Sequence, residues 1–280
     1  MSQLLLECRV IDQPPGKYFR SVGVVFAEFG DQTQDSGNIS YGIQVERERY
    51  FVKTAGTVND PRPSLDHPAR VALLRNAVRL NASVSHPLLP GLLGIIESPD
   101  GPLLIYPWLD GELVGVPREQ RDNPVSAFQR FRRLPSATLY TCLDSLFDLH
   151  EVLAHSGWIA GDFCDGSLLY DFVAGQLWAV DLDCYHHGHV INDQGRMFGS
   201  TRFMAPEEFE RGALIDEQTT VFVLGRAGLV FLSDGSLNVE PFRGSRPLFD
   251  VIVKACQPDR ARRFASVAAF FSAWRMARTV

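Results

Sequence analysis

The stretch "AGDFCDGSLLYDFVAGQLWAVDLDCY", residues 160–185, decides how the rest of the chain is interpreted. Asp162 and Asp181 each follow a short run of mainly apolar residues, and a short strand-like segment lies between them. Asp181 follows the apolar run "LWAV" directly, so it stands where a strand ends and a pocket can open. Taken alone, the two acids fit either a phosphoryl-transfer site or two ordinary turns.

The whole chain has the composition of a folded globular protein, with 280 residues of which 45% are hydrophobic and 21% are charged. Its length allows one large domain or two small ones. A net charge of −6 argues against a nucleic-acid-binding surface. No apolar run reaches the roughly 18–20 residues that a membrane span requires, and the N-terminus lacks the basic region of a signal peptide.

The cysteines are odd in number and dispersed, and no pair has CxxC spacing: Cys8, Cys142, Cys164, Cys184 and Cys256. This pattern argues against a disulfide framework or a cysteine zinc site. It favours a reducing compartment, so we expect the protein in the cytoplasm.

The first hundred residues are predicted to be mostly strands, and the remainder mostly helices. Strands are predicted at 18–29, 39–45, 49–55, 86–98 and 101–109. Helices are predicted from a cap at Asp66, over 136–155, and at the end of 255–274. The result is a small strand-rich half followed by a larger helical half.

Six motifs in this order resemble those of a protein-kinase catalytic domain, over nearly the whole length. They are "YFVK" (50–53), "LIYPWLDGEL" (104–113), "HSGWIAGDFCDGSLLYD" (155–171), "AVDLD" (179–183), "GSTRFMAPEEF" (199–209) and "CQPDRARRF" (256–264). Each motif is weak alone, and "FMAPEEF" is the most specific. The chain is similar to a divergent bacterial-type, eukaryotic-like serine/threonine kinase whose catalytic loop also resembles that of small-molecule phosphotransferases.

The resemblance implies an α+β, bilobal, protein-kinase-like fold in a single domain. A small antiparallel β-sheet N-lobe would span about 1–106, a hinge about 107–109, and a mainly helical C-lobe about 110–280. ATP would lie in the cleft between the lobes.

The resemblance also implies catalytic roles. Lys53 would pair with the α- and β-phosphates, Asp162 would orient the acceptor hydroxyl and receive its proton, and Asp181 would bind Mg²⁺. The alternatives from local sequence are a solvated strand lysine for Lys53 and a turn aspartate for Asp162.

Several positions depart from the family pattern. Cys164 and Ser167 stand where the family has lysine and asparagine; serine can still offer an oxygen to a second Mg²⁺, although it is a poorer ligand. Asp183 replaces the usual glycine and is either a second metal ligand or a solvated acid. The helix predicted after Asp66 has no acid to pair with Lys53, and Asn76 is the nearest polar substitute.

The nucleotide-binding residues expected from the resemblance lie in two places. Gly37 and Asn38, in the loop that replaces a glycine-rich motif, could direct backbone N–H groups at phosphate; a plain hairpin loop is the alternative. Tyr106, Trp108 and Leu109 belong to the expected hinge, where apolar surface would sandwich adenine, and a core role is the alternative.

Two further expectations concern the C-terminal half. Glu207 is expected to pair with Arg263 in a structural role. Gly161 stands where regulated kinases place an arginine that receives an activating phosphate, so activity is expected without phosphorylation of the segment 181–207.

The favoured function is ATP-dependent, Mg²⁺-assisted phosphorylation of a hydroxyl, with protein serine or threonine as the preferred acceptor. The alternatives are a pseudokinase, which binds nucleotide or a partner without turnover, and a kinase for a small molecule.

Overall fold

The computed structural model describes residues 2–30, 37–58 and 65–279, which form a mixed α+β fold with two compact units. Unit 1 comprises Met1–Ser85 and Pro90–Asp110, and unit 2 comprises His86–Leu89 and Gly111–Val280. The α+β class expected from the sequence is confirmed.

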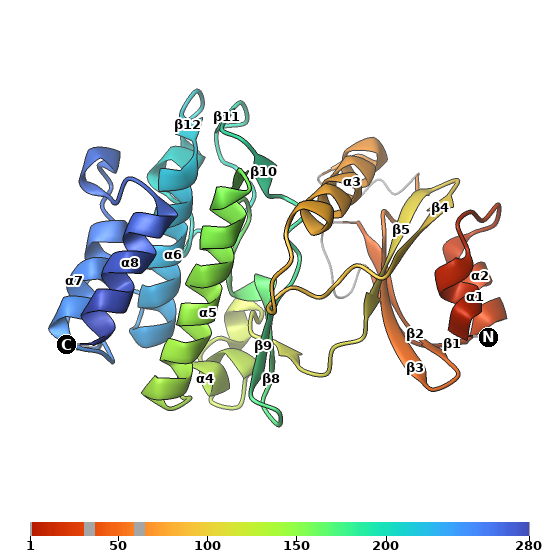
Figure 1. The fold of residues 1–280 in the computed structure, drawn as a ribbon, viewed down its shortest axis with the longest axis horizontal. Helices are drawn as coiled ribbons and strands as arrows, with labels where there is room; N and C mark the ends of the chain where they lie inside the picture. The colour runs from red at the N-terminus through yellow and green to blue at the C-terminus, as the bar shows by residue number, and fades with distance from the viewer. Residues whose placement is uncertain (1, 31–36, 59–64, 280) are drawn as a thin grey trace. The chain divides into compact units, whose positions relative to one another are not determined.

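Unit 1 is built on an antiparallel sheet with the strand order β1-β2-β3-β5-β4 (Figure 1). Its strands are β1 (Val24–Phe29), β2 (Ile39–Val45), β3 (Glu48–Thr54), β4 (Gly94–Ser98) and β5 (Gly101–Pro107). Its helices are α1 (Ser2–Glu7), α2 (Pro15–Val22) and α3 (His67–Ser83).

The two faces of this sheet are covered by different helices. Leu5 of α1 and Phe19 of α2 are fully buried against a face that includes Ile43. On the opposite face, Leu74 of α3 packs with Leu104 of β5. Because side chains alternate along a strand, β4 and β5 supply residues to both cores: Ile96 and Ile105 to the first, and Ile95 and Leu104 to the second.

The strand predicted over 18–29 is wrong in its first part, because residues 15–22 form α2. Pro15 at the helix start has a backbone φ already suited to a helix, and Tyr18 and Phe19 are buried on one face. Gly23 ends the helix, and a Cβ there would lie 2.4 Å from the carbonyl oxygen of Gln44. Only glycine therefore allows the backbone to lie this close to β2. The β-branched run therefore begins a strand only at Val24.

The strand predicted over 86–98 is also too long, since β4 starts at Gly94. Residues 87–89 form a turn, in which the backbone N–H of Leu89 donates to the carbonyl of His86 (2.9 Å). The carbonyl of Leu88 accepts a hydrogen bond from the N–H of Ala179 (2.8 Å), and both residues belong to unit 2. The predictions of β2, β3, and the Asp66 cap of α3 are confirmed; the Asp66 carboxylate accepts from the N–H of Ala69 (2.9 Å).

Unit 2 is mainly helical. Its α-helices are α4 (Ala127–Arg132), α5 (Ser136–His155), α6 (Glu217–Leu232), α7 (Arg246–Ala255) and α8 (Val267–Arg278). The helix predicted over 136–155 is confirmed as α5. Helix α6 is apolar on nearly all sides and almost wholly buried, as expected of a central helix. Phe147 of α5 meets Phe270 and Trp274 of α8 edge-on, at centroid distances of 4.9 and 5.2 Å.

Short strands and 3₁₀ turns shape the loops of unit 2. The strands are β6 (Glu112–Leu113), β7 (Trp158–Ile159), β8 (Leu168–Asp171), β9 (Gln176–Ala179), β10 (His186–His187), β11 (Val190–Ile191) and β12 (Leu214–Ile215). The 3₁₀ turns are η1 (Arg118–Gln120), η2 (Asp165–Ser167), η3 (Pro206–Phe209) and η4 (Arg260–Arg262). The antiparallel hairpin β8–β9 brings both ends of the stretch 160–185 together.

Candidate functional site

The predicted aspartates of unit 2 flank the open end of the β8–β9 hairpin. Leu168 pairs with Ala179, and the N–H of Val180 donates to the carbonyl of Ser167 (2.8 Å). The loop that carries Asp162 therefore enters the hairpin beside the point where Asp181 leaves it.

Both aspartates have a left-handed backbone conformation, with φ of 54° at Asp162 and 59° at Asp181. Among the described residues that are not glycine, Glu46 alone shares this feature. Left-handed conformations cost free energy for residues with a Cβ, and they concentrate at functional sites. The side chain of Asp162 is half-buried and that of Asp181 is exposed.

The loop before Asp162 is fixed by close backbone contacts. The N–H of Ala160 donates to the Thr220 hydroxyl of α6 (3.0 Å). A Cβ at Gly161 would lie 2.2 Å from the carbonyl oxygen of Cys184, so the loop and the segment after Asp181 touch through a glycine. This contact explains why no arginine stands before Asp162: a side chain at position 161 would overlap the backbone of Cys184.

Ser167, predicted as a metal ligand, closes the η2 turn. Its buried hydroxyl accepts from the N–H of Cys164 (3.3 Å) and donates to the carbonyl of Asp162 (3.5 Å). Asp183, which the sequence analysis offers as a second metal ligand beside Asp181, is buried with 7% of its surface exposed. No group of three or more His, Cys, Asp or Glu side chains in the described part of the chain is arranged to hold a metal ion. Mg²⁺ in phosphoryl-transfer sites is held by one or two carboxylates together with substrate phosphates, so Asp181 and Asp183 fit it chemically.

The segment 196–208 lies against the Asp162 carboxylate. Gly199 has a φ of 139°, and a Cβ there would lie 3.6 Å from Oδ1 of Asp162. The segment folds back on itself, since the N–H of Met197 donates to the carbonyl of Glu208 (2.9 Å). The Glu208 carboxylate accepts from the N–H of Ala205 (2.6 Å). Burial, and then the nearby negative charges of Glu207 and Asp162, raise the pKa of Glu208 to about 7.

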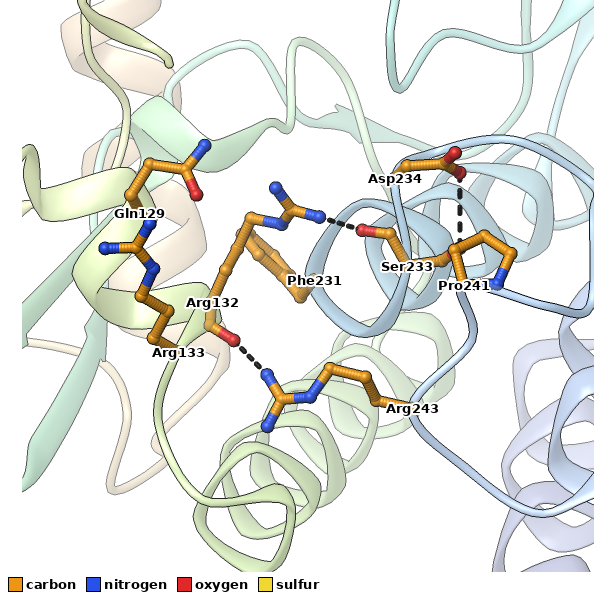
Figure 2. Close-up of a pocket in the computed structure, with 8 residues that line it drawn as sticks. All are labelled: Gln129, Arg132, Arg133, Phe231, Ser233, Asp234, Pro241 and Arg243. Carbon is orange, nitrogen blue, oxygen red and sulfur yellow. Dashed lines mark hydrogen bonds between the residues drawn. The ribbon is translucent and has the colours of Figure 1, made fainter. Parts of the chain in front are cut away.

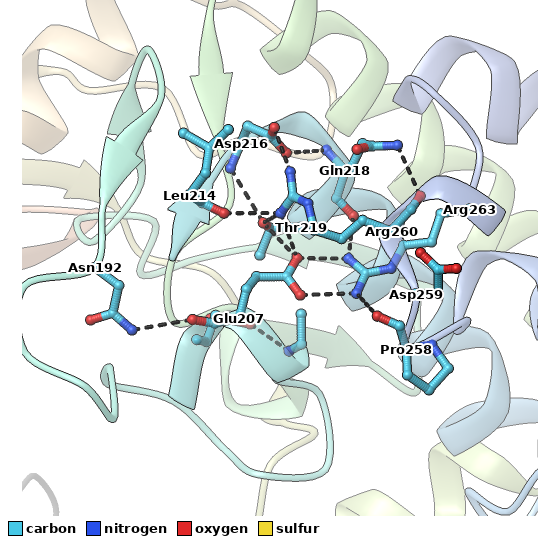
Figure 3. A network of polar contacts seen from close by, with 12 residues as sticks. Asn192, Glu207, Leu214, Asp216, Gln218, Thr219, Pro258, Asp259, Arg260 and Arg263 are labelled. Carbon is cyan, nitrogen blue, oxygen red and sulfur yellow. Dashed lines mark hydrogen bonds and ion pairs between the residues drawn. The ribbon is translucent and has the colours of Figure 1, made fainter. Parts of the chain in front are cut away.

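Glu207 is the centre of a buried ion-pair network (Figure 3). Arg263 binds it through two parallel contacts of 2.6 and 2.9 Å, which confirms the pairing predicted from the sequence. Arg260 also binds Glu207 (3.0 Å) and binds Asp216 (2.6 Å), a link that the sequence analysis did not predict. Burial acts to raise the pKa of Glu207, but the hydrogen bonds and charge of Arg263 outweigh it and hold the pKa below its ordinary value. The network joins η3, α6 and η4.

Lys53 is the last but one residue of β3, where it pairs with Ser40 of β2 and Leu104 of β5. By strand alternation it shares a sheet face with Phe51 and with the residues opposite them, including Gly42.

Aromatic rings cover this face around Gly42. Trp108 meets Phe26 edge-on (4.8 Å between centroids) and stacks with Phe29 (6.3 Å); Phe29 in turn lies 6.1 Å from Phe51. A Cβ at Gly42 would lie 2.7 Å from Phe26 and 2.9 Å from Trp108, so glycine is needed for the rings to lie on the sheet. We call Phe26, Phe29, Phe51 and Trp108 the aromatic face; its extent was not evident from the sequence.

The other predicted hinge residues have different surroundings. Tyr106 packs against the α3 core beside Leu104. Trp108 donates from its indole N–H to Asp110 (3.2 Å), which also pairs with Arg49 (2.7 Å). Leu109 is half-buried.

The predicted phosphate loop is only partly described, since residues 31–36 lie outside the described residues. Gly37 has a φ of 78°, and its carbonyl accepts from the guanidinium of Arg70. Asn38 is buried. Arg70, on α3, also donates to the carbonyl of Thr57 (2.9 Å).

Helix α3 contains no acidic residue, as the sequence indicates. Asn76, the polar substitute considered from the sequence, accepts a hydrogen bond from Arg79 on the same helix (3.2 Å). Arg70 is the buried charged residue of this helix, and sequence reasoning missed it because a lone arginine on a helix is ordinarily solvated.

A pocket of about 220 Å³ lies elsewhere in unit 2 (Figure 2). It is lined by Gln129, Arg132, Arg133, Phe231, Ser233, Asp234, Pro241 and Arg243, none of which is a predicted site residue. Its arginines donate to backbone carbonyls: Arg132 to Ser233, Arg243 to Arg132 and Leu134, and Arg133 to Pro124. Arg132 and Arg243 bind carbonyls at the C-terminal ends of α6 and α4, and Arg133 binds a carbonyl of the loop before α4. We therefore interpret the pocket as a structural contact region between these elements.

Within the described residues, no helix has the length and apolar character needed to cross a membrane. No family model matches this chain, and no curated protein matches it either.

Proposed function

We propose that this chain is a protein-kinase-like phosphotransferase that moves the γ-phosphoryl group of ATP to a hydroxyl, with protein serine or threonine as the preferred acceptor. The observation that carries the proposal is the left-handed backbone at both Asp162 and Asp181. The two residues lie in the segments that enter and leave the β8–β9 hairpin. Residues held in the left-handed conformation cluster at active sites and ligand-binding segments, which supports a chemical role for both acids.

In the proposed reaction, the acceptor oxygen forms a bond to the γ-phosphorus as the bond to the ADP oxygen breaks. The proton of the acceptor hydroxyl passes to the carboxylate of Asp162. Asp181 and Asp183 would hold Mg²⁺, which supplies neutralisation of phosphate charge when bound. Lys53 would bind nucleotide phosphate, and the aromatic face beside it suits stacking of a purine ring.

The test is transfer of labelled phosphate from ATP to generic protein acceptors and to small hydroxyl compounds in parallel. The unsubstituted protein should transfer labelled phosphate to the protein acceptors. Asp162→Ala should reduce the rate of this transfer by about 10²–10⁴-fold, the scale of a positioned base. Asp193→Ala, which removes an exposed acid from a neighbouring loop, is the matched control and should retain the rate. Equal rates in Asp162→Ala and the control would contradict the proposal. Labelling of small compounds alone would indicate the small-molecule kinase.

A second candidate, a nucleotide-binding pseudokinase, is favoured by Ser167. Its hydroxyl is engaged in the η2 turn, and α3 supplies no acid for Lys53. Ser167→Asn separates the two candidates, because an amide carbonyl is a better metal ligand than a hydroxyl. Faster transfer in this variant supports a weak enzyme. Nucleotide binding without transfer in either protein supports the pseudokinase.

A further inference from the structure

A buried ion pair joins the segment 196–208 to the loop that carries Asp162. The guanidinium of Arg202 contacts the carboxylate of Asp165, which is the first residue of the η2 turn. The Asp165 side chain is 4% exposed and that of Arg202 is 23% exposed. A buried carboxylate is costly without a cation, so the position of Asp165 depends on Arg202.

Arg202 is itself held on several sides. Its guanidinium lies over the rings of Phe128 and Phe203, at 5.2 and 5.3 Å from the centroids. Its backbone carbonyl accepts from Nε of Arg226 (2.6 Å), and Arg226 comes from the buried helix α6. The cation is therefore anchored to the core of unit 2 and is not a loose surface arginine.

The segment 196–208 contacts the loop of Asp162 at a second point, and the two contacts are three residues apart on both segments. Gly199 lies against the Asp162 carboxylate, and Arg202, three residues later, binds Asp165, three residues after Asp162. The η2 turn begins at Asp165 and ends at Ser167, whose hydroxyl donates to the carbonyl of Asp162. A shift of Asp165 would therefore be transmitted to Asp162 through the turn.

We propose that Arg202 is a positioning residue that holds the Asp162 carboxylate in place through its ion pair with Asp165. This inference rests on the proposed function, because the consequence of misplacing Asp162 is slower phosphoryl transfer. Nucleotide binding is left to other residues, so the Michaelis constant for ATP is unaffected.

The test combines transfer kinetics with hydrogen exchange on Arg202→Gln, Arg202→Lys, Asp165→Asn and the double variant Arg202→Gln/Asp165→Asn. A misplacement of about 1 Å lowers rates by roughly 10²-fold, so kcat of Arg202→Gln should fall by about 10–100-fold while KM for ATP stays within about twofold. Arg202→Lys, which keeps the charge, should recover part of the loss. The double variant should be no slower than Arg202→Gln, because the two residues act as one unit. Arg211→Gln, an exposed arginine after η3, is the matched control.

Hydrogen exchange provides a readout that does not need turnover. Amides of residues 160–168 should exchange faster in Arg202→Gln and in Asp165→Asn than in the Arg211→Gln control. Unchanged exchange there, or an active, folded Arg202→Gln with the kcat of the control, would overturn the inference. A parent without any transfer would overturn the proposed function instead. If Arg202→Gln does not fold, kcat and hydrogen exchange of Arg202→Lys and Asp165→Asn are compared with those of the Arg211→Gln control instead.

Discussion

Gly161 shows how a single residue governs the loop of Asp162. The space beside it is filled by the backbone of Cys184, which cannot move without displacing the segment that follows Asp181. The absence of an arginine before Asp162 is thus a packing requirement of this chain. Activity without phosphorylation of the segment 181–207 stays a prediction, which transfer kinetics on phosphate-free protein would test.

Gly161→Ala should therefore destabilise the protein. Its methyl group would overlap the Cys184 carbonyl at 2.2 Å, and overpacking of this kind costs about 1–3 kcal/mol. Gly91→Ala is the control, because its Cβ would meet no atom within 4 Å and the site is exposed. Urea unfolding of both variants measures the difference. Equal free energies of unfolding would mean that the close approach at Gly161 is relieved without cost.

At the scale of elements, the turn η3 carries two adjacent glutamates with opposite pKa shifts. Glu207 binds Arg263 and Arg260, whereas Glu208 is buried near the negative charges of Glu207 and Asp162. The local sequence "PEEF" gives no reason to distinguish them. Their pKa values differ because Glu207, and not Glu208, binds Arg260 of η4 and the adjacent Arg263.

Glu208 should make stability fall as the pH rises. Because its pKa is raised from 4.5 to about 7 in the folded state, the folded chain binds a proton there that the unfolded chain releases near pH 4.5. The contribution to stability is complete below pH 4.5 and is lost as the pH rises through about 7. Glu208→Gln should remove this loss, so its stability relative to the parent should be greater at pH 8 than at pH 5 by on the order of 1–3 kcal/mol. The exposed Glu210→Gln is the control; a Glu208→Gln difference independent of pH would refute the assignment.

Removing the cation from Glu207 should have a large effect. Arg263→Met leaves a buried carboxylate without its main partner, and breaking a buried pair costs about 3–5 kcal/mol. Arg260 still contacts Glu207, so we expect the lower part of this range. Arg262→Met, which removes a 75%-exposed arginine, should cost no more than about 1 kcal/mol. Chemical denaturation compares the two, and similar losses in both would argue against the buried network as a brace.

How much the sequence predicts differs between elements and contacts. Helix α5 and strands β2 and β3 were predictable, because each has a clear periodicity and local end signals. Helix α2 was not, because its buried Tyr18 and Phe19 run into the β-branched residues of β1 and hide the helical pattern. The pairing of Glu207 with Arg263 was anticipated through a family resemblance. The pairs Arg202–Asp165 and Arg70–Gly37 join distant parts of the chain, and nothing in their local sequences specifies the partner.

At the scale of the whole molecule, each unit carries one part of the chemistry that we propose. Unit 1 presents Lys53 and the aromatic face, and unit 2 presents Asp162, Asp181 and Asp183. The left-handed aspartates and the aromatic face are independent observations, and a phosphotransferase needs both nucleotide binding and acceptor activation.

ATP should stabilise the protein in a Mg²⁺-dependent manner. A ligand that binds only the folded state adds about 2.7 kcal/mol at a hundred times its dissociation constant. Thermal melts with ATP should therefore shift upward when Mg²⁺ is present, and less so with Mg²⁺ omitted or in Asp181→Asn. Identical melts in every condition would remove both the kinase and the nucleotide-binding pseudokinase.

The most direct test of the central claim is to measure ATP binding and phosphate transfer side by side in Lys53→Ala and Asp162→Ala. Binding can be followed by the fluorescence of Trp108, with Trp108→Phe to assign the signal. The account predicts that Lys53→Ala weakens both binding and transfer, because Lys53 holds nucleotide phosphate. It predicts that Asp162→Ala binds ATP nearly as the parent does and transfers about 10²–10⁴-fold more slowly. If Asp162→Ala transfers phosphate at the parent rate, or if both variants lose binding and transfer to the same extent, the division of roles proposed for these two residues is wrong.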